Sequence, residues 1–438
     1  MKNAYGVRFV PTSSTGTDIN RNLIVAMALT TIVGLQIPLI STGLAGLAVV
    51  YFVLWISKKP TTLPVGFVFR LLLLVAFAAI YETRAAAFGF GSIEGAIAYG
   101  CLIPGLYGVG YAMGRNFRSS LQIMWLALSG AFGFVVFAFL SSSGAYSPGV
   151  ATIEEYGKVA AGFWGGPLIN RPGLGSMASL GICLIPSLMF ISRRHTSNFR
   201  LLFLSLLSMA ALGLYTNIIL ANRTPFLALV AAFLISGLLA MTGGSARFKL
   251  RIVATAAVST IVLLMFSDAV IEYSSRLYIV TRFFEEGVDT AGRYDSWVAM
   301  LENLKNFQSG GRSAYIAGNT FVHNMWLDVA WDAGTEAFLM IVLFHLSQIP
   351  VIFSALGQNV PIIVRAVLLG LGTSIVTNFM QEPTMAASQV YFYFTCWLFG
   401  LILAMRSTKV YGVGSERSNP SRVRKNIAPI ASRPGRAI

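Results

Sequence analysis

The side chains best suited to chemistry stand in one long polar segment, residues 292–334. Two of them are arginines, Arg293 and Arg312, and a planar guanidinium can bind two oxygens of a phosphate at once. The third is His323, whose imidazole has a free pKa of about 6.5 and can move a proton at neutral pH. Asn324 beside it can hold a substrate hydroxyl or cap the following helix. The segment predicts a site that binds an anion and moves a proton, and a purely structural histidine is the alternative for His323.

Two further arginines stand at the ends of apolar segments. Arg223, in LANRTPFLALV, occupies the tip of a tight hairpin between two apolar helices. An arginine there either extends to the lipid headgroups or points into a cavity between helices, where charged groups are usually functional. Arg171 precedes Pro172 at the start of another apolar segment, and a helix N-terminus beside an arginine favours phosphate. A plain interfacial arginine is the alternative for Arg171.

The rest of the chain has the composition of a membrane protein. Of its 438 residues, 55% are hydrophobic and 11% are charged, with a mean hydropathy of +0.70, whereas soluble proteins have about 25% charged residues. The apolar residues form blocks long enough to cross a bilayer as helices. We predict about twelve spans, at residues 22–40, 43–57, 65–81, 92–113, 121–140, 172–192, 199–220, 224–242, 252–271, 335–355, 361–379 and 386–405. The predicted fold is an all-α, polytopic transmembrane bundle.

The charged residues predict how these spans are oriented. Most of the 32 Lys and Arg residues fall on one side of the predicted spans, and most of the 17 Asp and Glu residues fall on the other. Since Lys and Arg collect in cytoplasmic loops, we expect a cytoplasmic tail at 1–21, a transmembrane domain at 22–405 and a basic, disordered cytoplasmic tail at 406–438. Long periplasmic loops are expected at about 141–171 and 272–334. The positive charge is spread over every cytoplasmic turn, so a nucleic-acid partner is not expected.

Several other kinds of site leave no pattern in the sequence. The three cysteines stand inside apolar blocks, and His323 has no His or Cys partner at metal-ligand spacing. The sequence has no Walker loop, no GxGxxG after a strand and no GxSxG elbow. We therefore expect neither a metal nor a cofactor, and an ATP-driven enzyme is disfavoured.

Taken together, the many spans, the arginine at a hairpin tip and the long outer loop resemble the O-antigen ligase/polymerase superfamily of bacterial envelope glycosyltransferases. The resemblance covers roughly residues 165–400, and it is carried by the order and spacing of the motifs rather than by any single one. The matching residues are Asn222–Arg223, Gly292–Arg293, Trp297, Gly310–Gly311, His323–Asn324, Leu327–Asp328 and Gly334.

The resemblance implies a membrane glycosyltransferase. Members of this superfamily act on undecaprenyl-diphosphate-linked glycans at the periplasmic face of the bacterial inner membrane, and are thought to need neither metal nor nucleotide. Carried over to this chain, Arg223 and Arg293 hold the donor diphosphate and His323 activates the acceptor hydroxyl. We also expect Arg171, Arg312, Asn324 and Asp328 to contribute to substrate binding.

The sequence leaves the acceptor open. A polymerase transfers the glycan to another lipid-linked repeat unit, and a ligase transfers it to lipid A–core. The segment HNMWLDVAWDAG, residues 323–334, is slightly more similar to polymerases, so we favour that reading, with a chain-length regulator as a candidate partner besides membrane lipids. A lipid-linked polysaccharide transporter or flippase is the alternative outside this class, and a structural scaffold is a third.

Overall fold

The computed structural model of the chain describes residues 19–58, 63–87, 93–117, 119–145, 159–164, 168–191, 198–243, 293–307, 309–311, 321–357 and 360–414. The predicted span at 252–271 and the predicted site residue Arg312 lie outside the described residues, as do about half of the two predicted outer loops and most of both tails.

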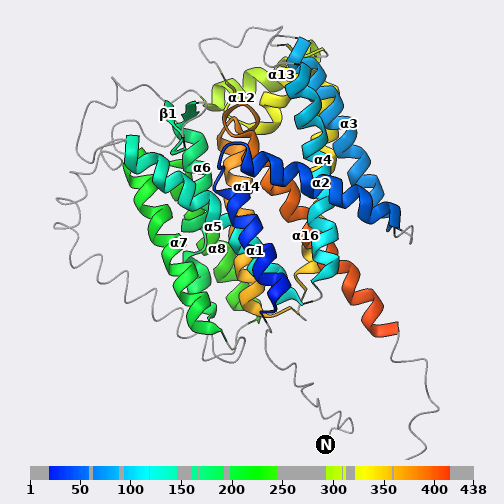
Figure 1. The fold of residues 1–438 in the computed structure, drawn as a ribbon. Helices are drawn as coiled ribbons and strands as arrows, with labels where there is room; N and C mark the ends of the chain where they lie inside the picture. Colours follow the sequence, from blue (N-terminus) through cyan, green and yellow to red (C-terminus); the bar gives the residue numbers. More distant parts are fainter. Residues whose placement is uncertain are drawn as a thin grey trace, which may run out of the picture.

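The described chain is an all-α bundle (Figure 1). Its helices are α1 (Arg21–Gly34), α2 (Ile40–Lys58), α3 (Val65–Ala87), α4 (Ile93–Asn116), α5 (Ser120–Ala145), α6 (Arg171–Ile182), α7 (Phe199–Leu220), α8 (Thr224–Gly243), α12 (Arg293–Glu302), α13 (Met325–Ala355), α14 (Ile362–Gln381), α15 (Thr384–Ala387) and α16 (Gln389–Gly414), with short 3₁₀ helices at Ile185–Phe190 and Leu304–Phe307. A small antiparallel ribbon joins β1 (Val159–Ala161) to β2 (Leu168–Asn170). Among the described residues, nine helices are long and apolar enough to cross a membrane. The predicted multi-pass helical fold is confirmed at this level.

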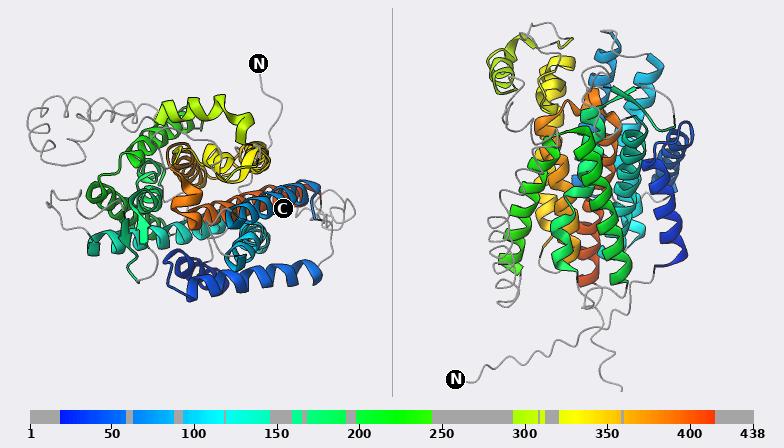
Figure 2. Two further views of the ribbon diagram at one scale, coloured as in Figure 1. Left: turned by 90° about the horizontal axis from the view of Figure 1, so that it is seen from above. Right: turned by 90° about the vertical axis from the view of Figure 1, so that its left-hand side faces the viewer.

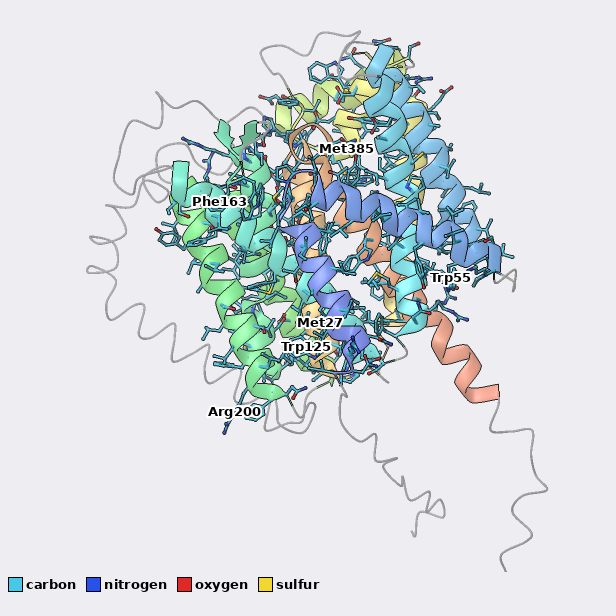
Figure 3. The ribbon with its side chains drawn as sticks, viewed as in Figure 1. Met27, Trp55, Trp125, Phe163, Arg200 and Met385 are labelled. Atoms are coloured by element: carbon cyan, nitrogen blue, oxygen red, sulfur yellow. The ribbon has the colours of Figure 1, made fainter. Side chains whose placement is uncertain are left out.

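The bundle has two distinct ends. Figure 3 places Arg200, at the start of α7, at one end and Met385, in α15, toward the other. The helix α12, the ribbon and the first part of α13 lie at the end marked by Met385 (Figures 1 and 2). The described residues that the sequence singled out for chemistry belong to these elements or to helix ends beside them.

The first two helices differ in length and direction from the predicted spans. Helix α1 has 14 residues, so it is about 21 Å long at 1.5 Å per residue, less than the roughly 30 Å of a bilayer core. It ends before Gln36 and Leu39, which have φ angles of 51° and 62°, and before Pro38. This turn directs α2 obliquely across the bundle (Figure 1). At the other end of the chain, α16 continues to Gly414, past the predicted boundary at 405.

Glycines allow α6 and α7 to approach closely. A Cβ atom on Gly181 would lie 2.2 Å from the carbonyl oxygen of Met209, and one on Gly213 would lie 2.5 Å from that of Ala178. Small residues at such contacts let helices pack backbone to backbone within a membrane. Gly175, in the first half of α6, likewise faces Asn222, just after α7. The start of α6 therefore lies beside the end of α7, where two of the predicted arginines stand.

A buried polar network links α6, α14 and α16. Asn378 accepts a hydrogen bond from Ser176 (2.8 Å) and donates one to Ser179 (2.8 Å). Ser179 also bonds with Ser374 at 2.5 Å, and Ser374 bonds with Tyr391 at 3.1 Å. All five side chains are buried. Because buried polar groups must be satisfied to be tolerated, this network fixes the rotation of α14 about its axis.

Helix α13 begins earlier than the predicted span at 335–355. Residues 325–333 already form a helix, and the axis breaks at Gly334, where φ is 89° and ψ is 172°. Arg84 donates to the carbonyl oxygen of Ala333 at this break and pairs with Glu336. The first part of α13 is thereby held as a separate segment at the end of the bundle that Met385 marks.

Candidate active site

The candidate site is built around Glu382, a carboxylate that the sequence analysis did not single out. Glu382 is the residue that ends α14, with extended backbone angles, and Pro383 follows it. A proline after the last turn prevents the helix from continuing. The side chain of Glu382 is only 2% exposed. A buried carboxylate is costly unless charged or hydrogen-bonding groups face it.

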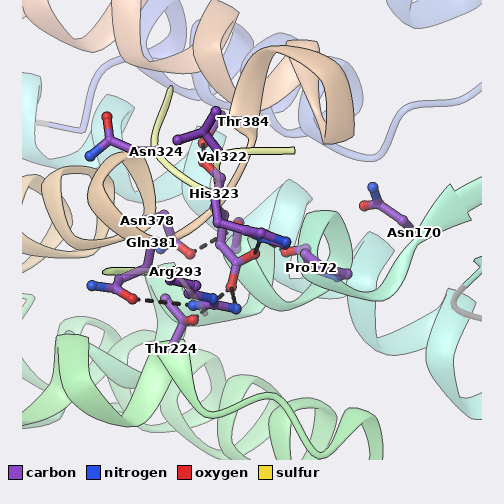
Figure 4. Close-up of polar contacts among 12 residues, drawn as sticks. Asn170, Pro172, Thr224, Arg293, Val322, His323, Asn324, Asn378, Gln381 and Thr384 are labelled. Carbon is purple, nitrogen blue, oxygen red and sulfur yellow. Dashed lines mark hydrogen bonds and ion pairs between the residues drawn. The ribbon is translucent and has the colours of Figure 1, made fainter. Parts of the chain in front are cut away.

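Three segments distant in sequence supply those groups (Figure 4). The hydroxyl of Thr224 donates a hydrogen bond to Oε1 of Glu382 at 2.6 Å. Nη2 of Arg293 lies 3.7 Å from the same oxygen, and Nδ1 of His323 lies 4.0 Å from Oε2. Nη1 of Arg293 also donates to the side-chain oxygen of Gln381 at 3.1 Å. The fold therefore gathers a guanidinium, an imidazole and a hydroxyl on one carboxylate.

The three side chains differ in how far they are exposed to solvent. The Arg293 and His323 side chains are 22% and 23% exposed, against 2% for Glu382. The cation and the imidazole can thus be reached from solvent, while the carboxylate lies behind them. Such an arrangement can bind an anion through the guanidinium and pass a proton through the imidazole.

Arg293 is positioned by α12, whose first residue it is. Met300 and Trp297 of this helix pack against Val322 and Leu327 at the start of α13. The indole nitrogen of Trp297 also donates to the carbonyl oxygen of Val322 at 3.0 Å. These contacts fix α12 beside the segment that carries the histidine.

The backbone of His323 is held by Asp328. His323 has a φ of 58°, in the left-handed region, which costs a non-glycine residue about 1–2 kcal/mol. The two residues beside it donate their backbone N–H groups to Asp328, Val322 to Oδ1 at 2.7 Å and Asn324 to Oδ2 at 3.1 Å. Asp328 is 1% exposed. One buried carboxylate therefore clamps both sides of the histidine.

Asn324 caps the helix that follows. Its side-chain oxygen accepts a hydrogen bond from the backbone N–H of Leu327 at 3.2 Å, in the position that asparagine favours before a helix. The sequence left two roles open for Asn324, and the structure shows it as a helix cap. Substrate binding by Asn324 and Asp328 stays a prediction.

Arg223 stands beside this cluster in the chain. Helix α7 ends at Ala221 in a left-handed conformation (φ 48°), and the carbonyl oxygen of Arg223 accepts the first helical bond of α8, from Phe226, at 3.0 Å. The next residue, Thr224, is the one that bonds to Glu382. Arg223 thus lies in the short turn between α7 and α8, and this turn is attached directly to the candidate site through Thr224.

Arg171 is the first residue of α6. The side chain of Asn170 caps this helix by accepting from the N–H of Gly173 at 2.9 Å, and Pro172 occupies the first turn. Figure 4 draws Asn170 and Pro172 in the same close-up as His323. Ser176 connects α6 to Asn378 of α14, one turn before Glu382. The helix start predicted at Arg171 is therefore present and is packed against the helix that ends in the site.

The structure thus brings together His323, Arg293 and the Arg223 hairpin, and it adds Glu382, Gln381 and Thr224. The only local signal for Glu382 was a carboxylate next to Pro383 at the end of an apolar span. Nothing in the sequence indicated which residues would face it. Within the described part of the chain, no group of three or more His, Cys, Asp or Glu residues could hold a metal.

An apolar cavity of about 690 Å³ lies beside the bundle core. Helices α1, α2, α4, α5 and α16 line it, and so do Gly162 and Ile169 at the ribbon. Ile169 immediately precedes Asn170 and Arg171. The cavity therefore extends from the apolar middle of the bundle to β2, the strand that leads into α6.

Comparison of the chain with models of known protein families finds no match, and comparison with curated proteins finds no significant similarity.

Proposed function

We propose that this protein is a polysaccharide polymerase that transfers a glycan from an undecaprenyl-diphosphate donor to a lipid-linked repeat-unit acceptor. The observation that carries the proposal is the cluster in which Arg293 and His323 face the buried carboxylate of Glu382, with the Arg223 hairpin attached to it. An anion-binding guanidinium beside a proton-accepting imidazole is what transfer from a diphosphate to a hydroxyl requires.

The proposed reaction uses these groups in one displacement. The acceptor oxygen forms a bond to the anomeric carbon of the donor sugar, while the bond from that carbon to the diphosphate oxygen breaks. His323 takes the proton of the acceptor hydroxyl, and the diphosphate leaves as an anion. Arg293 and Arg223 stabilise the negative charge that grows on the leaving group, which is most valuable in the transition state.

Two further features support a lipid-linked substrate. The cavity of about 690 Å³ is lined mostly by apolar side chains and reaches Ile169, two residues before Arg171. A hydrocarbon chain could lie there with its phosphate at the start of α6, where Arg171 and free backbone N–H groups favour anions. Arg312 and the outer loops would then complete the glycan side of the site.

The proposal places the protein in the bacterial inner membrane. It includes about twelve spans, cytoplasmic termini, and long periplasmic loops at about 141–171 and 272–334. This orientation follows from the Lys and Arg bias of the sequence, and it puts the Glu382 end of the bundle on the periplasmic side.

Two other functions compete with polymerisation. A ligase would use the same donor and the same residues but would take lipid A–core as its acceptor. A transporter of lipid-linked polysaccharide would not need His323 to accept a proton. The accessible imidazole facing Glu382 favours transfer chemistry over transport.

The test is complementation of a deletion strain with His323→Ala, Arg223→Ala and Arg293→Ala, followed by gel analysis of the surface glycan. We expect each variant to reduce chain extension by at least about 10²-fold, leaving single repeat units on lipid A–core. Arg200→Ala is the matched control, because Arg200 is an exposed arginine at the opposite end of the bundle (Figure 3).

The outcomes of this experiment distinguish the polymerase from the ligase and the transporter. Lipid A–core without any glycan would assign the ligase, and lipid-linked repeats retained on the cytoplasmic side would assign the transporter. Full-length ladders from all three variants, with normal protein levels, would refute the site.

A further inference from the structure

We propose that Glu382 is an exchangeable counter-ion that couples diphosphate binding at Arg293 to proton acceptance at His323. The inference rests on the proposed function and adds a regulatory step to it. In the structure without substrate, one carboxylate serves both groups. When the donor binds, Arg293 turns to the diphosphate, and Glu382 is left to stabilise a positively charged His323.

The contact distances support exchange rather than a permanent ion pair. Arg293 Nη2 lies 3.7 Å from Oε1, and His323 Nδ1 lies 4.0 Å from Oε2. Both separations exceed the 2.7–3.2 Å usual for a nitrogen–oxygen hydrogen bond. By contrast, Thr224 holds Oε1 at 2.6 Å. The carboxylate is thus fixed by a neutral hydroxyl, while Arg293 and His323 approach it loosely.

The exposed fractions of Arg293 and Glu382 indicate how an anion from solvent would enter the site. Arg293 is 22% exposed and Glu382 is 2% exposed, so an anion from solvent meets the guanidinium without first displacing the carboxylate. A diphosphate carries more charge than one carboxylate and can bind the guanidinium through two oxygens. The side-chain oxygen of Gln381, which also accepts from Arg293, is a neutral acceptor that the diphosphate can replace.

Exchange at Arg293 has a consequence at His323. A buried carboxylate that loses a cationic partner becomes unfavourable unless another positive charge approaches it. Of Thr224, Arg293 and His323, which contact Glu382, His323 is the one that gains a charge by accepting a proton. With Nδ1–H directed to Oε2, the atom left to accept the acceptor's proton is Nε2.

The coupling orders the reaction. Before the donor binds, Arg293 shares the negative charge of Glu382, and the imidazolium is less well stabilised. After the donor binds, the same carboxylate supports the imidazolium. The acceptor hydroxyl is therefore deprotonated efficiently only when a diphosphate occupies the site.

The test uses Glu382→Gln, because the amide keeps the shape of the side chain and removes its charge. We expect two opposite effects on the purified full chain in nanodiscs. Farnesyl diphosphate, a short polyprenyl diphosphate, should bind about tenfold more tightly, since the carboxylate of Glu382 no longer competes for Arg293. Glycan transfer should become at least about tenfold slower, since the imidazolium loses its counter-ion. A purely structural role would weaken binding and transfer together.

Two further variants separate charge from packing. Thr224→Val removes the 2.6 Å hydrogen bond to Glu382 but keeps the carboxylate, so diphosphate binding should not tighten. Glu382→Asp keeps the charge, so its affinity for farnesyl diphosphate should be unchanged or weaker than that of the wild-type chain. This variant provides the test if Glu382→Gln does not fold.

The outcomes distinguish the two proposals. If the wild-type chain binds no farnesyl diphosphate, the proposed function is wrong. If the wild-type chain binds it and Glu382→Gln binds no more tightly, the coupling is refuted while the proposed function stands. Tighter binding by Thr224→Val or by Glu382→Asp would equally refute the coupling, because neither variant removes the charge.

Discussion

The clamp on His323 gives the sharpest prediction about the site. In Asp328→Asn the side chain keeps one oxygen and replaces the other by an amide that cannot accept a hydrogen bond. One of the two bonds, from Val322 at 2.7 Å or from Asn324 at 3.1 Å, is therefore lost, and two donors then face each other in a buried place.

The size of the effect follows from these bonds. A hydrogen bond to a charged group contributes about 1.5–3 kcal/mol, and the left-handed backbone of His323 (φ 58°) itself costs about 1–2 kcal/mol. Losing one bond lets the backbone relax from this conformation. A change of about 2 kcal/mol corresponds to a factor of about 30 in the population of the active arrangement. We expect the initial rate of glycan transfer in nanodiscs to fall by this factor.

Controls make this reasoning refutable. Asp295→Asn changes an exposed aspartate in the first turn of α12 and should leave the rate within about twofold. In a His323→Ala background, Asp328→Asn should cost little more, because it acts through the histidine. Intrinsic-fluorescence melting checks the fold. A folded Asp328→Asn variant with a wild-type rate would show that the clamp does not position His323.

Two further predictions concern packing around the site. Thr224→Val should lower the transfer rate by about tenfold, because Glu382 loses the hydrogen bond from Thr224 (2.6 Å). The control, Thr242→Val at the far end of α8, should leave the rate unchanged. Equal transfer rates in the two variants would contradict the role of Thr224. Gly213→Leu should destabilise the fold by about 3 kcal/mol or more, because a Cβ atom there would lie 2.5 Å from a backbone oxygen. Gly237→Leu is the control, because no atom of the described residues lies within 4 Å of a Cβ added at Gly237. Similar melting temperatures for the two glycine variants would refute the close approach of α6 and α7.

Much of the fold was determined by the sequence alone. Apolar blocks of bilayer length predict spanning helices because a chain in lipid must satisfy its backbone hydrogen bonds internally. Most of the predicted spans among the described residues are helices near the expected positions, such as 199–220 and 224–242, observed as α7 and α8. Local signals also predicted the helix start at Arg171 and the hairpin at Arg223, since proline and capping residues act over only a few positions.

Local patterns were less reliable where the backbone departs from a regular helix. The turn after Gly34 and the break at Gly334 depend on φ angles that surrounding contacts stabilise, such as the bond from Arg84 to Ala333. The sequence also could not decide between capping and substrate binding for Asn324, because one side-chain oxygen serves either role.

The sequence by itself determined a multi-pass helical protein with arginines and a histidine suited to anion and proton chemistry. Only the tertiary structure decided that Arg293 and His323 face the same carboxylate, Glu382, and that Thr224 fixes it. Residue types are a property of the chain, whereas a buried charge acquires its partners through the packing of segments far apart in sequence. The polar network of α14 and the clamp of Asp328 provide that packing, and no spacing along the chain encodes it.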